Sequence, residues 1–151
     1  MDKSIKLWQL TGIATVFTFI CSLFLPFKTI TPNTTIFTYE VLYNKFIELL
    51  NFIIHMSFTN SFTSYILNYA EFMAFILLFI SLIGILWNSL SKNILLTIIS
   101  TLFYIPTIFV FVFNLSNSAN IISYGSGYYL IIISISLSIL IIIQNRIFST
   151  N

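Results

Sequence analysis

Charged residues are scarce in this chain. They make up 7% of its 151 residues, and hydrophobic residues make up 58%, whereas about a quarter of an ordinary soluble domain is charged. A soluble domain of this length leaves much of its surface in water, so it has no place for so many apolar side chains. The composition therefore predicts an integral membrane protein whose apolar surface is solvated by the lipid bilayer.

Cysteine and histidine are almost absent, with one residue of each. A single cysteine, Cys21, excludes an internal disulfide, and a single histidine excludes the usual His/Cys zinc sites. We therefore predict no metal and no cofactor. The net charge of +2, with no basic cluster along the chain, argues in the same way against nucleic-acid binding.

What the chain does have is four long hydrophobic runs. The clearest extends from Phe72 to Trp87 without a charge. Extended back to Tyr69, it approaches the roughly 20 residues that a helix needs to cross a hydrocarbon core about 30 Å thick. We predict an all-α membrane protein, a four-helix transmembrane bundle that forms one domain over residues 1–151. The predicted spans are residues 7–27, 69–87, 94–113 and 127–143.

The first run carries small and hydroxylated residues at spacings of three and four, so they lie on one face of a helix: Thr11, Ala14, Thr15, Thr18 and Ser22. Small side chains let helices approach closely, which predicts a packing seam. The alternative is a polar path for transport, lined by these hydroxyls. Pro26 is expected to end the helix, because proline lacks a backbone N–H and disfavours helix in the residue before it.

Residues 28–64 form the longest polar connection, and residues 39–54 within it repeat with a helical period. Leu42, Phe46 and Leu49 fall on one face. This pattern predicts an amphipathic helix that lies on the membrane or caps the bundle. We predict that these three residues, together with Glu71, contribute to binding a partner.

The opposite face of this predicted helix carries Glu40 and Glu48, and His55 continues the line. These three side chains suggest a metal or acid–base site, but one histidine without a second His or Cys makes a solvated face the preferred interpretation. Glu71 is a separate case. It lies about 24 Å along the helix from Trp87, which puts this acid near the membrane boundary rather than at its centre.

Basic residues indicate the orientation. If both termini are cytoplasmic, the inner side holds more Lys and Arg than the outer side, as the positive-inside rule requires. The inner residues are then Lys3, Lys6, Lys92 and Arg146, and the outer ones Lys28 and Lys45. We therefore predict a multi-pass protein of the cell membrane with a long first and a short second outer loop. The richness in Ile, Phe, Asn and Tyr is typical of AT-rich genomes and indicates a bacterial source.

Two short motifs carry a resemblance: Leu25-Pro26-Phe27 after the first run, and Gly125-Ser126-Gly127-Tyr128-Tyr129-Leu130 at the start of the fourth. On these, the chain resembles a broad group of small bacterial four-helix membrane proteins. Its loop layout is also similar to that of claudins, although the claudin signature in the first loop, a Trp followed by a Cys pair, is absent. The resemblance implies a topology, and it implies no catalytic residue and no substrate.

Three classes of function remain to be weighed. The predicted spans contain no Asp, Lys, Arg or His, and no nucleophile or phosphate-loop motif is present, so we expect no enzyme. The favoured interpretation is a non-catalytic interaction protein, such as an accessory or scaffold subunit or an immunity-type protein, that binds another membrane protein. The alternative is a homo-oligomeric channel or small-molecule transporter. The sequence leaves open whether a lipid or small molecule binds between the helices.

Overall fold

The computed structural model describes residues 6–31, 34–54, 62–116 and 123–148. These residues are mostly helical. The helices are α1 (Leu7–Leu23), α2 (Thr38–Ile54), α3 (Phe62–Leu90), α4 (Ile94–Ser116) and α5 (Ser126–Phe148). Three short strands accompany them, namely β1 (Pro26–Thr31), β2 (Thr34–Phe37) and β3 (Ser123–Tyr124).

Three helices are long and apolar enough to cross a membrane. The apolar stretches are Tyr69–Leu90 in α3, Ile94–Val112 in α4 and Ser126–Gln144 in α5. Helix α1 is also apolar but has 17 residues, which is at the lower limit of the range of about 17–25 for a span. The three later predicted spans are therefore confirmed as helices of spanning length. Helices α3 and α5 extend beyond both predicted ends, and α4 extends beyond its predicted C-terminal end.

The expectation of an all-α fold is wrong in one respect, because the two loops join in a small antiparallel sheet of order β2-β1-β3. The sheet also shortens the first helix, which ends at Leu23 instead of residue 27. Pro26 begins β1, and the residue before a proline favours an extended backbone. The threonines that follow, among them Thr29 and Thr35, favour strands.

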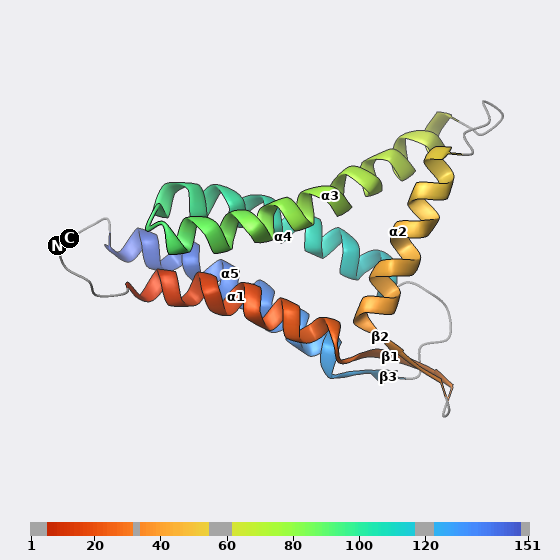
Figure 1. The fold of residues 1–151 in the computed structure, drawn as a ribbon, viewed down its shortest axis with the longest axis horizontal. Coiled ribbons are helices and arrows are strands. Elements are labelled where there is room, and N and C mark those ends of the chain that lie inside the picture. Colours follow the sequence, from red (N-terminus) through yellow and green to blue (C-terminus); the bar gives the residue numbers. More distant parts are fainter. Residues whose placement is uncertain (1–5, 32–33, 55–61, 117–122, 149–151) are drawn as a thin grey trace.

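The helices form two antiparallel pairs, α1 with α5 and α3 with α4. The pairs lie close together at the end where α3 turns into α4, and they diverge toward the other end (Figure 1). Helix α2 crosses the wide end of this wedge, between the start of α3 and the sheet. The sheet and α2 therefore form one structural layer at the wide end, which we call the outer platform.

Hydroxyl groups buried within the helices bond to their own helix backbone. Thr15 Oγ1 donates to the carbonyl of Thr11 (2.9 Å), and Thr101 Oγ1 donates to the carbonyl of Thr97 (2.7 Å). Such a bond satisfies the hydroxyl without water. The polar residues inside the bundle therefore do not require a hydrated path.

One hydrogen-bonded chain joins three helices at the centre of the bundle. Ser134 Oγ of α5 donates to the carbonyl of Thr15 in α1 (2.9 Å) and lies 2.7 Å from Tyr104 Oη of α4. Because the single hydroxyl proton of Ser134 is used on Thr15, Tyr104 is the donor to Ser134. The ring of Tyr104 also packs edge-to-face on Phe19, with centroids 6.3 Å apart. The phenol is thus fully buried and fully paired.

The end of α1, the start of α2 and the start of α5 meet at one point, which we call the junction. The carbonyl of Leu25 accepts two hydrogen bonds from Thr38, one from the backbone N–H (3.1 Å) and one from the hydroxyl (3.2 Å). The carbonyl of Phe27 accepts the N–H of Gly125 (2.8 Å). Phe27 is fully buried and packs edge-to-face on Tyr128.

Glycine is required at the junction because the backbones approach so closely. A Cβ atom at Gly127 would overlap the carbonyl oxygens of Leu25 and Pro26 and the hydroxyl of Thr38. A Cβ atom at Gly125 would overlap the carbonyl of Pro26. Backbone atoms cannot move aside as a flexible side chain can, so the two loops fit together only with glycine at these positions.

We expect Gly127→Ala to destabilise the protein by about 1–3 kcal/mol, the usual cost of forcing an extra group into a packed site. The matched control is Gly84→Ala in α3, where the added Cβ meets side-chain atoms of Ser100 and Asn88 and no backbone atom. The Ser100 hydroxyl can rotate away, and alanine stabilises a helix by about 1 kcal/mol relative to glycine. Thermal unfolding in detergent, followed by tryptophan fluorescence, measures both. Equal effects of the two substitutions would contradict a backbone constraint at the junction.

Candidate functional site

The outer platform is the part of the structure where ionisable side chains gather. Its helix α2 starts at the junction, where Glu40 in the first turn accepts the backbone N–H of Phe37 (2.9 Å). This is half of a capping box, in which an acid near the helix start satisfies a backbone donor that the helix leaves free. Glu40 therefore stabilises the start of α2.

The apolar face of α2 packs inside the protein. Leu42 and Leu49 are buried, and the ring of Phe46 stacks on Phe75 of α3 with centroids 5.5 Å apart. Residues 39–54 thus contact the helix bundle through this face. The role of these three residues in binding a partner stays a prediction. Leu42 and Leu49 are buried and Phe46 is half-buried, so a partner would have to contact other, exposed residues of α2.

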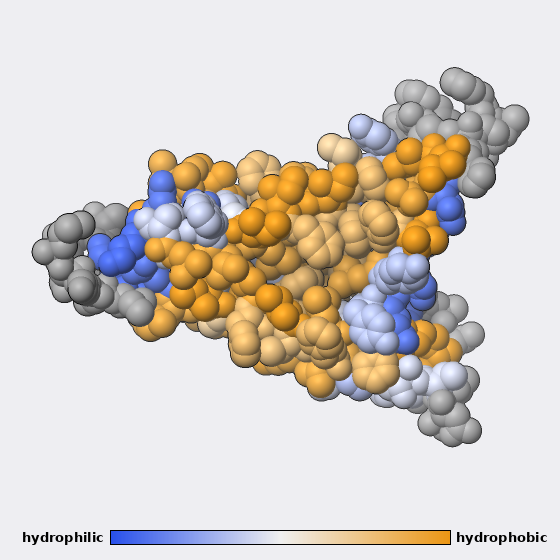
Figure 2. All heavy atoms as spheres, in the orientation of Figure 1, coloured by the Kyte–Doolittle hydropathy of each residue, from blue (hydrophilic) through white to orange (hydrophobic). Residues whose placement is uncertain are grey.

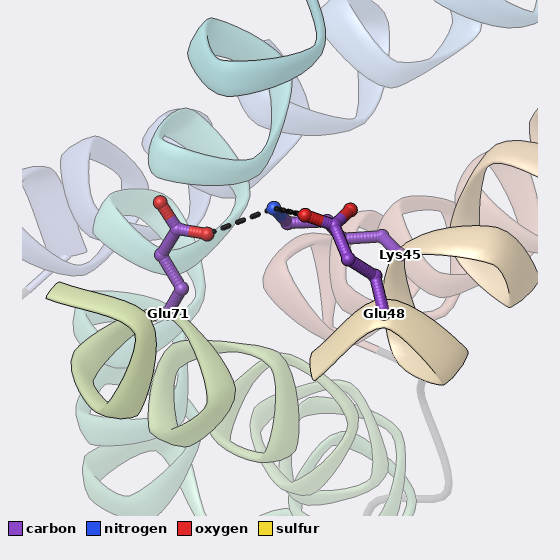
Figure 3. Close-up of polar contacts among 3 residues, drawn as sticks. All are labelled: Lys45, Glu48 and Glu71. Atoms are coloured by element: carbon purple, nitrogen blue, oxygen red, sulfur yellow. Dashed lines mark ion pairs between the residues drawn. The ribbon is translucent and has the colours of Figure 1, made fainter. Parts of the chain in front are cut away.

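Glu71, the fourth residue predicted to bind a partner, forms an ion pair with Lys45 of α2. Figure 3 shows the Lys45 amine between two carboxylates, 3.0 Å from Glu71 Oε2 and 3.6 Å from Glu48 Oε1. The side chains of Lys45 and Glu71 are 21% and 25% exposed, and that of Glu48 is 69% exposed. The oxygen of Glu71 that faces Lys45 is fully shielded from solvent. We call these three residues the charged triad.

A small apolar slot lies directly beneath the triad, between α2, α3 and α4. Its volume is about 20 Å³, enough for one water-sized group. Lys45 and Glu71 form its polar rim. The other lining residues are almost all apolar: Leu49, Ala74, Phe75, Leu78, Thr107, Val110 and Phe111. The slot is much smaller than the pockets that bind cofactors and small molecules, whose volumes are about 300–1,000 Å³.

Other ionisable groups of the platform do not assemble a reactive centre. Lys28 in β1 is buried, and burial lowers the pKa of its amine. Within the described ranges, no three His, Cys, Asp or Glu side chains lie close enough to hold a metal ion. The combination of Glu40, Glu48 and His55 considered from the sequence is only partly visible, because His55 lies outside the described residues.

The solvent-facing side of α2 carries aromatic residues that sequence reasoning did not single out. Tyr39 and Tyr43 are both exposed and lie one helical turn apart, and Tyr39 stacks on Phe37 at 6.0 Å. The four-residue spacing of the two tyrosines could have predicted from the sequence that they lie together, because residues i and i+4 share a helix face.

A second polar cluster lies at the narrow end of the bundle and was also missed. Gln9 Nε2 of α1 donates to the carbonyl of Ser89 in α3 (2.8 Å). Thr11 Oγ1 lies 3.2 Å from Gln144 Oε1 of α5. All four side chains are buried. These contacts tie α1 to α3 and α5 near the chain termini, and both glutamines are used in packing.

Comparison with known proteins gives no match: no family model, curated protein or solved structure is significantly similar to this chain. The resemblance in layout to small bacterial four-helix membrane proteins and to claudins therefore stays a prediction. Function has to be inferred from the geometry of the chain itself.

The ion pair makes a direct prediction for stability. Glu71→Gln leaves the Lys45 amine with a weaker partner in a poorly solvated place, so we expect a loss of about 1–3 kcal/mol. Glu48→Gln is the matched control, and because that side chain is well exposed we expect a change within about 0.5 kcal/mol. Thermal unfolding in one detergent measures both. A Glu71→Gln protein as stable as wild type would show that the pair does not hold α2 against α3.

Proposed function

We propose that this protein is a non-catalytic integral membrane protein that binds another membrane protein through the exposed side of α2. The observation that carries the proposal is the pair of exposed tyrosines, Tyr39 and Tyr43, on a helix fixed at its start by the junction and along its length by the charged triad. Tyrosines that are exposed on a rigid element supply large contact areas at low entropic cost.

The outer dimensions of the bundle suit a bilayer. Tyr69 and Trp87 are both exposed on α3, and their separation along the helix is about 27 Å, close to the roughly 30 Å of a hydrocarbon core. Aromatic residues favour the two membrane interfaces. Figure 2 shows one face of the molecule, with apolar residues over its middle, on α1 and α3, and hydrophilic residues at its two ends.

Helix α1 completes the proposed four-helix transmembrane bundle. It packs along α5 for its full length, and its 17 residues make it about 26 Å long. The span is short because the chain leaves the helix to enter β1. A short span is tolerated when flanking residues or the local bilayer adjust.

The distribution of charge supports cytoplasmic termini and an outer platform outside the cell. Lys6, at the start of α1, and Lys92, in the turn between α3 and α4, lie at the narrow end together with the last turns of α5. Those last turns carry Arg146, so three basic residues lie at the narrow end among the described residues, against Lys28 of β1 and Lys45 of α2 at the wide end. An excess of basic residues on one side favours that side as the cytoplasmic one.

The ionisable groups of the platform have structural uses, which favours binding over catalysis. Glu40 caps α2 and Glu71 pairs with Lys45. An enzyme would need acids, bases or nucleophiles aimed into a pocket that admits a substrate. The slot beneath the triad is too small for that purpose.

The alternative of a channel between copies of the chain receives less support. Thr15 and Thr18 are the hydroxyls expected to line such a pore. Thr15 is fully buried and bonds to the Thr11 carbonyl, and Thr18 is half-buried and bonds to the Ala14 carbonyl. A pore between copies would need polar side chains on an outward face of the bundle. The outward faces are instead largely apolar, as expected for contact with lipid.

The proposed orientation is testable with single cysteines in a Cys21→Ser background. Thr35→Cys in β2 should react with a membrane-impermeant maleimide on intact cells, because we propose that this exposed strand lies outside. Ser91→Cys, in the exposed turn at the opposite end, should react only after the cells are permeabilised. The reverse pattern would overturn the orientation.

The binding surface is testable by affinity purification from native membranes in mild detergent, with mass spectrometry of the proteins retained. We expect a stoichiometric membrane protein partner whose yield falls about 5- to 30-fold with Tyr43→Ser, the size of effect for a residue central to an interface. Tyr129→Ser is the matched control, since Tyr129 is similarly exposed, at 57% against 64%, but lies on α5.

Two results would contradict this proposal. Equal partner yields for both tyrosine variants would move the interface away from α2. A pure homo-oligomer without any partner would favour the channel, and conductance of the reconstituted protein would then be the decisive measurement.

A further inference from the structure

The residues that line the slot beneath the charged triad follow the membrane normal, as a lipid tail does. On α3 these lining residues run from Glu71 to Leu78, a distance of about 10 Å along the helix axis. Leu78 lies midway between the interface residues Tyr69 and Trp87. The slot thus begins with charged groups at the depth of the headgroups and ends among apolar side chains near the middle of the bilayer.

The walls of the slot suit an alkyl chain. Leu49, Phe75 and Leu78 line the inner side, and Val110 of α4 lines the outer side with 40% of its surface exposed. The slot is open on one side, where the surrounding exposed residues are apolar. A flexible chain can therefore lie along the surface and insert one end or bend into the space of about 20 Å³, which a compact molecule cannot enter.

The rim carries both signs of charge within a few ångströms. Lys45 contributes one positive charge, and Glu48 and Glu71 contribute two negative charges, so the sum is 1 − 2 = −1. Glu71 is the shielded partner of Lys45 at 3.0 Å, whereas Glu48 is exposed and more distant at 3.6 Å (Figure 3). A ligand can therefore replace Glu48 at Lys45 without disturbing the pair that holds α2.

A headgroup with a phosphate and a primary ammonium matches this rim. Its phosphate can bind Lys45, and its ammonium can bind the carboxylate of Glu48 that the phosphate displaces. The exchange keeps every charge paired. An anionic headgroup without an ammonium would instead meet a rim whose net charge is negative, which disfavours it.

We propose that the slot and the charged triad form a binding site for one zwitterionic phospholipid with a primary ammonium, its tail along the surface with one end or bend in the slot and its headgroup on Lys45 and Glu48. The site lies in the outer leaflet, so this inference rests on the membrane orientation proposed above. The lipid would bind independently of the protein partner proposed for Tyr39 and Tyr43.

The test uses the full-length protein in nanodiscs that contain equal amounts of phosphatidylethanolamine and phosphatidylglycerol. After transfer into mild detergent, native mass spectrometry counts the lipids that stay bound. We expect one phosphatidylethanolamine per chain in the wild type. Val110→Trp fills the slot and should reduce retention about tenfold or more. Leu102→Trp is the control, because Leu102 is exposed on the same helix and does not line the slot.

Headgroup recognition is tested separately with Glu48→Gln. Removing this carboxylate should lower the preference for phosphatidylethanolamine over phosphatidylglycerol about two- to fivefold, as expected for an exposed ion pair. Glu40→Gln removes the same charge from the same helix but away from the triad, and a glutamine still caps the helix, so it should leave the preference unchanged.

Three results would overturn the lipid site: no retained lipid in the wild type, equal retention by Val110→Trp and Leu102→Trp, or an unchanged preference in Glu48→Gln. A wild-type protein that captures its protein partner but retains no lipid would overturn this inference alone. A protein that retains the lipid in the expected way but captures no partner would overturn only the proposed function.

Discussion

The close approach of two loops at the junction is the constraint on which the remaining structure depends. Gly125 and Gly127 let the start of α5 lie against the carbonyls of Leu25 and Pro26, and the Leu25 carbonyl in turn holds Thr38 at the start of α2. One point of contact therefore fixes where α1 ends, where α5 begins and in which direction α2 leaves. Because α2 leaves this point across the wide end of the wedge, the middle of the helix reaches α3 and brings Lys45 to Glu71.

The bundle and the outer platform are stabilised by different forces. Inside the bundle, serine and threonine hydroxyls bond to nearby carbonyls, and the Tyr104–Ser134 pair joins three helices. Apolar side chains are solvated as well by lipid as by the protein interior. The hydrophobic effect therefore does not hold the helices together in a membrane, and close packing and hydrogen bonds have to do so. In the proposed membrane placement the platform lies in water, so burial of the apolar face of α2 adds a hydrophobic contribution there. The charged triad lies at the boundary between these two environments.

Hydropathy predicts the helices because each long apolar run has a single physical explanation in a membrane. The period of residues 39–54 likewise predicts the helix α2 and its apolar side. The sheet could not be predicted in the same way, since β3 has two residues and strand pairing depends on a partner distant in sequence. The ion pair between Lys45 and Glu71 could not be predicted either, because these two residues are also distant in sequence. The two motifs that carry the family resemblance contain the two sides of the junction, Leu25-Pro26-Phe27 and Gly125-Ser126-Gly127.

The buried and the exposed residues of α2 have different roles. Its apolar face is used against the bundle, so that face contributes rigidity and cannot also receive a partner without local unfolding. Rigidity favours binding through the exposed residues of α2, because side chains that are already ordered lose less entropy when a partner arrives. Tyr39 and Tyr43 meet this condition, since the helix that carries them is capped by Glu40 and held to α3 by Lys45 and Glu71. A fixed surface of this kind is what the proposed recognition of a partner requires, whereas a transport pathway needs parts that move.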